Sequence, residues 1–188
     1  RQLNVDETVV FRAVAKKRRG VKKPTSVEPV REKLPNAQAH AERDLLAILL
    51  RFANMIPAVY ENMDVDELAD KNHRVILSQI FEQYVNTGRV NPQHVLDYVE
   101  DPEMQKFIVN SMMEEGEIPP DALRRWLSDC LRLIKIGTIQ KDIQAAREAI
   151  RQHAQDAAKL KQWNKKYQNL KKQEMEIRRK EFIALDKD

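Results

Sequence analysis

The chain has 188 residues and a formal net charge of +4, with 33 Lys and Arg against 29 Asp and Glu. Its single cysteine, Cys130, excludes an internal disulfide and is in keeping with a reducing compartment, so we expect a cytoplasmic protein. The longest apolar run, residues 45–50, is far too short to cross a membrane. Scarce glycine, the absence of any alternating apolar and polar stretch and a high content of helix-forming residues predict an all-α fold.

The charges fall into three blocks. Residues 1–40 carry a net charge of +6, residues 41–118 of −9 and residues 119–188 of +7. The first block contains "KKRRGVKKPTSVEPVREKLP" (16–35), which has three prolines and no apolar periodicity. We interpret residues 1–40 as the end of an upstream domain followed by a basic linker. A nucleic-acid-binding patch in residues 16–23 is the alternative interpretation of the basic cluster.

A compact bundle of about six helices is predicted for residues 41–136. It begins with "AERDLLAILLRFA" (41–53), whose leucines form a broad apolar face. A short helix at 58–62 and a turn of helix after the N-cap Asp64 follow.

The next stretch, "KNHRVILSQIFEQYVNTG" (71–88), carries one histidine in the first turn of an apolar helical face. Asp70 or Asn72 is expected to cap this helix, and Gly88 to end it in the left-handed conformation. We interpret it as the central helix of the bundle and His73 as a packed or capping residue rather than a catalytic base. The apolar face comprises His73, Ile76, Leu77, Ile80, Phe81 and Tyr84.

Three further helices are predicted to start at a proline in the first turn. Asn91-Pro92, Asp101-Pro102 and Pro119-Pro120 supply these starts, the first two with a capping side chain before the proline. The inward residues are expected to be Met104, Phe107, Ile108 and Met112 in the second of these helices, and Leu123, Trp126, Leu127, Cys130, Leu131 and Ile134 in the third.

Residues 137–188 are predicted to form an antiparallel helical hairpin. Gly137 is expected to kink or break the preceding helix, and residues 153–156 to form the turn, with Asp156 as a cap. The apolar steps of the two helices are heptad-like and weaken at Glu174. The seam between them is expected to hold Ile139, Ile143, Ala146, Ile150, Leu160, Trp163, Tyr167 and Leu170.

No pattern in the sequence indicates catalysis or metal binding. The four histidines are scattered, and none has a Cys, Asp or Glu at a spacing that makes a zinc site. There is no phosphate-binding glycine loop and no Ser in a nucleophile elbow. We therefore expect no catalytic residue, metal, cofactor or small-molecule substrate in this segment.

The ordered combination of these segments resembles a known family. "AERDLLAILLRFANMI", a short acidic turn, "NHRVILSQIFEQYVNTGRVN", "DPEMQKFIVNSMMEE" and a charged terminal hairpin look like the C-terminal region of bacterial DNA primase, over about residues 41–185. The resemblance implies a module without enzymatic activity of its own that binds and modulates the hexameric replicative helicase, so that RNA primers are made at the replication fork. It also implies a parent nucleotidyltransferase, whose zinc, magnesium and DNA contacts would belong to parts upstream of Arg1.

Within that interpretation, the end of the chain is the predicted partner-binding surface. Apolar residues off the seam, flanked by arginines, are typical of a helix-on-helix interface. The predicted helicase-binding residues are Met175, Arg178, Arg179, Phe182, Ile183 and Leu185. Two alternatives remain: a nucleic-acid-binding protein that uses the lysines of the basic hairpin, and the related N-terminal domain of the replicative helicase, which is disfavoured because a basic linker precedes this bundle.

Overall fold

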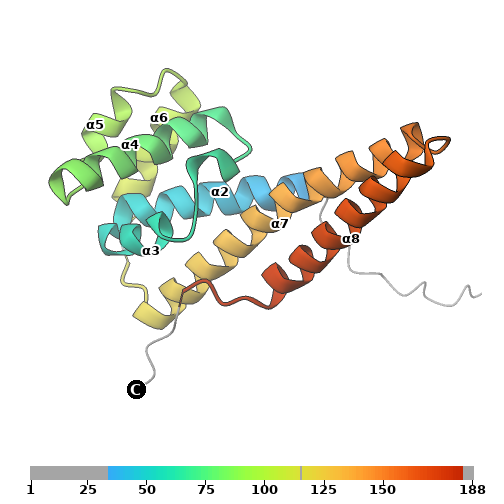
Figure 1. Ribbon diagram of the computed structural model, residues 1–188. Helices are drawn as coiled ribbons and strands as arrows, with labels where there is room; N and C mark the ends of the chain where they lie inside the picture. Colours follow the sequence, from blue (N-terminus) through green and yellow to red (C-terminus); the bar gives the residue numbers. More distant parts are fainter. Residues whose placement is uncertain (1–33, 115, 184–188) are drawn as a thin grey trace, which may run out of the picture. The chain divides into compact units, whose positions relative to one another are not determined.

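The computed structural model describes residues 34–114 and 116–183, and their fold is all-α, as predicted (Figure 1). No helix in these residues is both long and apolar enough to cross a membrane. The elements, in chain order, are α2 (Leu34–Arg51), the 3-10 turn η2 (Ala53–Met55), α3 (Ile56–Tyr60), the 3-10 turn η3 (Val65–Glu67), α4 (Lys71–Thr87), α5 (Pro92–Leu96), α6 (Pro102–Met113), α7 (Pro120–Gln152) and α8 (Ala157–Arg179).

Local chemistry sets most of these boundaries. Asp70 accepts the N–H groups of Asn72 and His73 at the start of α4, and Gly88 ends this helix with a φ of 69°. Side chains of Asn91 and Asp101 cap α5 and α6, each directly before a proline. The predicted caps of these helices are confirmed.

Helix α2 is the centre of the bundle. It packs against α4, α6 and the first part of α7, so the prediction that α4 is the central helix was wrong (Figure 1). Most of the core consists of apolar side chains from these four helices, and fully burying each of them is worth roughly 1.5–3 kcal/mol. The largest fully buried ones include Leu45, Leu46, Ile48, Leu49, Ile76, Leu77, Ile80, Ile108, Leu127, Leu131 and Ile134.

Two predicted boundaries differ from the structure. Helix α2 begins at Leu34, so the division placed at 40/41 falls inside a helix. The predicted linker and basic cluster before residue 34 lie outside the described residues. Helix α7 runs unbroken through Gly137, so the predicted break there was wrong, and the division placed at 136/137 also falls inside a helix.

The structure gives a reason for a glycine inside α7. A Cβ on Gly137 would lie 2.2 Å from Oε1 and 3.0 Å from Cγ of Gln38, a buried side chain of α2. Glycine is therefore the residue that allows α2 to approach α7 closely at this point. Close packing of α2 on α7, rather than a break in the helix, accounts for the glycine at position 137.

Two residues predicted to face inward lie at the surface. Met112 of α6 is 42% exposed and Trp126 of α7 is 37% exposed. The indole N–H of Trp126 donates to Asp44 of α2 at 3.3 Å, so its polar edge is satisfied at the rim of the core. The other inward residues predicted for α6 and α7 are buried or half-buried.

Candidate partner-binding surface

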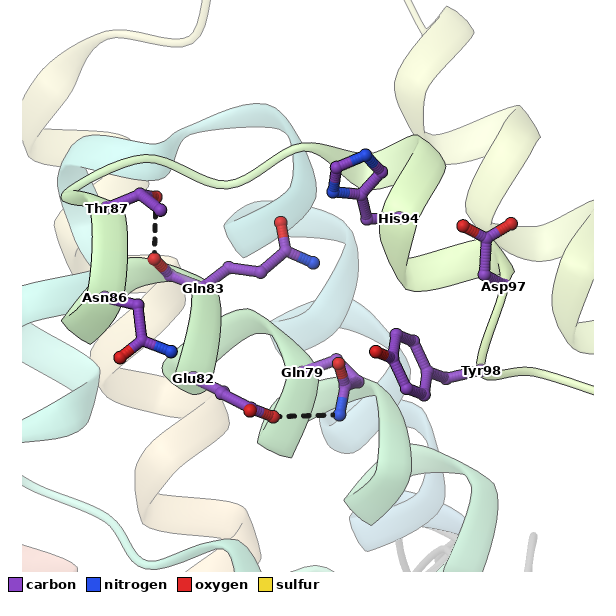
Figure 2. A pocket seen from close by; sticks show the side chains of 8 residues that line it. All are labelled: Gln79, Glu82, Gln83, Asn86, Thr87, His94, Asp97 and Tyr98. Carbon is purple, nitrogen blue, oxygen red and sulfur yellow. Dashed lines mark hydrogen bonds between the residues drawn. The ribbon is translucent and has the colours of Figure 1, made fainter.

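A polar recess of about 370 Å³ lies between the second half of α4 and α5 (Figure 2). Within it, Gln79 donates to Glu82, and the Thr87 hydroxyl donates to the Gln83 carbonyl oxygen. Side chains with amide and carboxyl groups dominate the lining, without a hydrogen-bonded pair of nucleophile and base. The lining residues are Gln79, Glu82, Gln83, Asn86, Thr87, His94, Asp97 and Tyr98. Among the described residues, no group of three or more His, Cys, Asp or Glu side chains is arranged to hold a metal.

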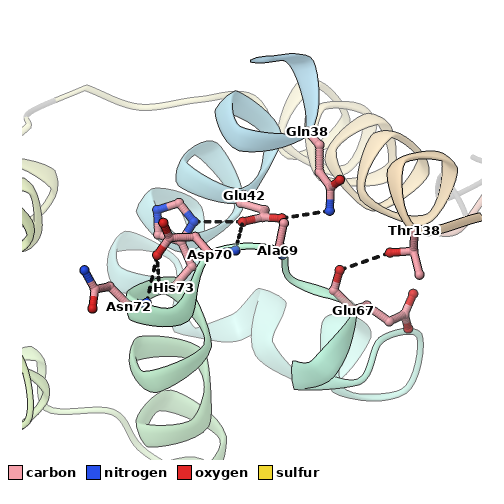
Figure 3. Close-up of polar contacts among 8 residues, drawn as sticks. All are labelled: Gln38, Glu42, Glu67, Ala69, Asp70, Asn72, His73 and Thr138. Carbon is pink, nitrogen blue, oxygen red and sulfur yellow. Dashed lines mark hydrogen bonds and ion pairs between the residues drawn. The ribbon is translucent and has the colours of Figure 1, made fainter. Parts of the chain in front are cut away.

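His73 lies on the opposite end of α4 and is bound to a carboxylate that sequence reasoning missed. Its Nδ1 lies 2.9 Å from Oε2 of Glu42 in α2, and both side chains are buried (Figure 3). Glu42 also accepts from the N–H of Ala69 at 2.6 Å, the N–H of Asp70 at 3.2 Å and Nε2 of Gln38 at 2.9 Å. We call this set, Gln38, Glu42, Ala69, Asp70 and His73, the Glu42 network.

The charge and hydrogen bonds of the Glu42 network indicate a structural role, in which it holds α2 to α4. Burial by itself raises the pKa of Glu42, but the hydrogen bonds from His73, Ala69 and Asp70 outweigh it, so the pKa lies below its usual value. An ionised carboxylate only accepts hydrogen bonds, so Nδ1 of His73 carries the proton of this bond. The predicted packed position of His73 is confirmed, and the histidine joins α2 to α4.

A sequence signal for Glu42 existed. Glu42, Leu45, Leu46 and Leu49 follow the i, i+3, i+4, i+7 spacing, which puts an acidic side chain on the buried face of α2. A buried carboxylate needs donors, and four donors meet it here.

The turn before α4 is fixed to α7 as well as to α2. Lys135 Nζ lies 2.7 Å from both carboxylate oxygens of Glu67. The Thr138 hydroxyl donates to the Glu67 carbonyl at 3.1 Å (Figure 3). The Asp64 N–H donates to the same Glu67 side chain and completes the predicted cap of η3. This segment is therefore held from two sides.

Helix α8 packs along the second half of α7 (Figure 1). The turn at residues 153–156 joins them, and Asp156 caps α8 by accepting two backbone N–H groups, as predicted. The seam buries Ile139, Ile143, Ala146 and Leu170, with Trp163, Tyr167 and Ile177 packed against them. The aromatic side chains of α8 therefore face α7, in agreement with the heptad-like spacing.

Glu174 occupies the seam where the apolar register weakens. Its buried carboxylate accepts from Lys171, from Arg178 at 2.8 Å and from Gln140 of α7 at 3.0 Å. Burial raises the pKa of Glu174, but these hydrogen bonds, that of Lys171 first, lower it to about 2. The interruption in the apolar pattern is thus a buried carboxylate whose hydrogen bonds are satisfied by two partly exposed cations and an amide.

The chain after α8 returns to the bundle. The Phe182 N–H donates to Oγ of Ser128 at 3.1 Å, and the Arg132 guanidinium donates to the Lys180 carbonyl at 3.3 Å. The Phe182 and Ile183 side chains are 7% and 8% exposed and belong to the core of the bundle. This return fixes the end of α8 to the first half of α7.

The predicted partner-binding residues are therefore divided by the structure. Phe182 and Ile183 are core residues, so their predicted contact with a partner was wrong. The single-sequence pattern cannot distinguish an apolar tail that packs inward from one that stays exposed. Leu185 lies outside the described residues.

Three of the six residues remain at the surface. Met175 is 54% exposed, and Arg178 and Arg179 are exposed on the same end of α8. Arg178 is engaged with Glu174, which leaves its position fixed. We call Met175, Arg178 and Arg179 the α8 end surface.

Cys130 has no chemical role in this arrangement. It is buried in the core, and burial raises the pKa of its thiol to about 12, with the nearby Asp44 and Asp129 adding to the effect.

The sequence matches no protein-family model and no curated protein.

Proposed function

We propose that this chain is the helicase-binding region of a bacterial DNA primase. In this proposal it docks on the hexameric replicative helicase and modulates it, so that RNA primers are made at the replication fork. The segment itself has no catalytic step, and the polymerase activity, with its zinc and magnesium, belongs to upstream parts of a full-length primase. The cytoplasm is the corresponding location.

The observation that carries the proposal is the order of segments over residues 41–185, from the leucine-rich first helix to the charged terminal helices. An all-α bundle followed by two long packed helices is the architecture that the proposal requires. The α8 end surface supplies an exposed apolar group followed within one helical turn by two arginines, which is the composition of a helix-on-helix contact.

The proposed mechanism is a tether. A docked module holds the primer-synthesising domains close to the unwound template and raises their effective concentration there. The bundle and the α7–α8 pair share α7 as one continuous helix, so a contact on α8 is mechanically joined to α2 and the rest of the bundle.

A direct binding experiment tests the proposal. The fluorescently labelled 188-residue chain is titrated with the hexameric replicative helicase encoded by the same genome, and saturable binding is expected. The double variant Met175→Glu/Arg179→Glu should weaken this binding at least about tenfold, which corresponds to about 1.4 kcal/mol.

The chain offers a matched control. Val85 is 61% exposed on α4 and Arg89 is exposed four residues later, so Val85→Glu/Arg89→Glu makes the same change of charge and polarity elsewhere. The control should change the affinity less than twofold. Absence of helicase binding by the wild-type chain would exclude the proposed function. Equal binding by both double variants would remove the α8 end surface from it.

A further inference from the structure

The face of α8 opposite the seam carries a row of lysines. Trp163, Tyr167 and Leu170 turn toward α7, and the 100° step of the helix then places Lys161, Lys165 and Lys172 on the outer side. All three lysines are exposed, and the exposed amides Gln168 and Asn169 lie between the second and the third. We call Lys161, Lys165, Gln168, Asn169 and Lys172 the α8 outer row.

These lysines differ from the other lysines of α8 in their partners. Lys159 pairs with Asp156, Lys171 pairs with Glu174, and Lys166 lies over the Trp163 ring at 5.0 Å. Within the described residues, Lys161 and Lys165 make no ion pair, and the pair of Lys172 with the exposed Glu176 is long, at 3.9 Å. An exposed pair of that length contributes little, so the row presents about three charges to solvent.

The positive charge of α8 contrasts with the negative charge of the segment that contains α2 to α6. Helix α8 holds eight basic and two acidic residues, whereas residues 34–114, from α2 to the residue after α6, hold 6 basic and 13 acidic residues. A polyanion is therefore attracted to α8 and repelled from the bundle.

The composition of the row favours a phosphate backbone over a protein surface. Protein interfaces are poor in lysine at their centre and need apolar or aromatic anchors, and none of the row residues is apolar. The lysines and amides of the row supply hydrogen-bond donors about one helical turn apart. From residue 161 to residue 172 they cover 11 steps of the helix, or roughly 17 Å at about 1.5 Å per residue. The row is a single line of donors, and the remaining lysines of α8 are engaged with Asp156, Glu174 or the Trp163 ring, so it matches one phosphate backbone rather than the two of a duplex.

We propose that the α8 outer row binds the phosphate backbone of single-stranded nucleic acid. The site goes beyond the proposed docking on helicase, because it uses residues 161–172, which precede the α8 end surface along the helix, and needs no partner protein. Trp163 and Tyr167 are packed in the seam, so no aromatic ring is free there to stack on bases. Binding is therefore electrostatic and without base preference.

The test is a salt titration with a fluorescent oligomer of 20 thymidines and the 188-residue chain. Each phosphate contact on a single strand contributes about −0.7 to the slope of log K against log salt concentration. The variant Lys161→Gln/Lys165→Gln/Lys172→Gln should therefore make the slope shallower by about 2 and weaken binding about tenfold at roughly 50 mM salt. Glutamine retains helix propensity, and the circular dichroism spectrum should not change.

Two controls isolate the row. The variant Lys71→Gln/Arg89→Gln/Lys106→Gln removes the same charge from exposed positions on the bundle and should leave the slope unchanged. Both sets are also compared in a chain whose six basic residues within 16–23 are glutamine, so that this cluster does not contribute to binding.

Three results would overturn the proposal. The first is an unchanged slope in the α8 variant, and the second is an equal loss in the bundle variant. The third is tighter binding of a duplex of the same length through the same lysines, which would refute the assignment to a single strand. If the α8 variant keeps its binding to thymidine oligomers but no longer binds helicase, the row belongs to a protein contact instead. Loss of oligomer binding by the α8 variant supports this site whether or not the wild-type chain binds helicase.

Discussion

Replacing Glu42 with alanine removes the acceptor at the centre of the Glu42 network. Four hydrogen bonds to its carboxylate are lost at once, from Gln38, Ala69, Asp70 and His73. Ala69 and Asp70 are exposed residues, so water can take over their N–H groups. Gln38 and His73 are 4% exposed and would keep buried polar groups without a partner.

The magnitude follows from these two buried groups. Each unsatisfied buried polar group costs about 1–3 kcal/mol, and two such groups are left here. We expect Glu42→Ala to lower the free energy of unfolding by about 3–4 kcal/mol. For a domain of this size that corresponds to a fall in Tm of roughly 10 °C.

The assay is urea and thermal unfolding followed by circular dichroism at neutral pH. Glu42→Gln keeps one acceptor oxygen and should cost about half as much. Glu82→Ala is the matched control, because this exposed carboxylate of α4 is hydrogen-bonded only to Gln79 among the described residues, and its loss should change stability by less than about 0.5 kcal/mol. A loss below about 1 kcal/mol for Glu42→Ala would refute the conclusion that the network joins α2 to α4.

Two further predictions concern α7 and α8. Gly137→Ala should not give the stabilisation of about 1 kcal/mol that this change gives inside an ordinary helix, because the new Cβ would meet the Gln38 side chain. When Gln38 is also replaced with alanine, the stabilisation should appear in urea unfolding. Stabilisation by Gly137→Ala alone would contradict the close packing of α2 on α7. Glu174 has a folded-state pKa of about 2 against 4.5 in the unfolded chain, so its contribution is fully present above about pH 4.5 and is lost as the pH falls toward 2. Because Lys171 and Arg178 are partly in solvent, we expect that contribution to be about 1–2 kcal/mol. Glu174→Gln should remove this pH dependence from unfolding measured between pH 2 and 6, and an unchanged profile would show that the carboxylate is not held as described.

A deletion of residues 170–188 is not a clean test of the proposed docking on helicase. Deleting residues 170–188 would remove Leu170 from the seam and Phe182 and Ile183 from the bundle core. Loss of helicase binding by that deletion would then report unfolding as much as a lost contact. Surface substitutions at Met175 and Arg179 avoid this ambiguity because they leave both cores intact.

The helical class, the order of most elements and their caps could be predicted from the residues alone. These features depend on residues within a few positions of one another. Asp70 and Asn91 accept N–H groups two or three residues ahead, and Gly88 adopts a conformation that its own lack of a side chain allows. The seam positions of Trp163 and Tyr167 were predictable for the same reason, since a helical period fixes which side chains share a face.

The partners of the buried polar groups and the positions of Phe182 and Ile183 depend on how the helices pack in three dimensions. Glu42 meets His73 across 31 residues, and Glu174 meets Gln140 across 34. Phe182 is bonded to Ser128 across 54 residues, so a side chain predicted to contact a partner lies in the core instead. Such pairings depend on how whole helices pack, and an apolar or acidic residue has the same local pattern whether its partner is another helix, solvent or a second protein.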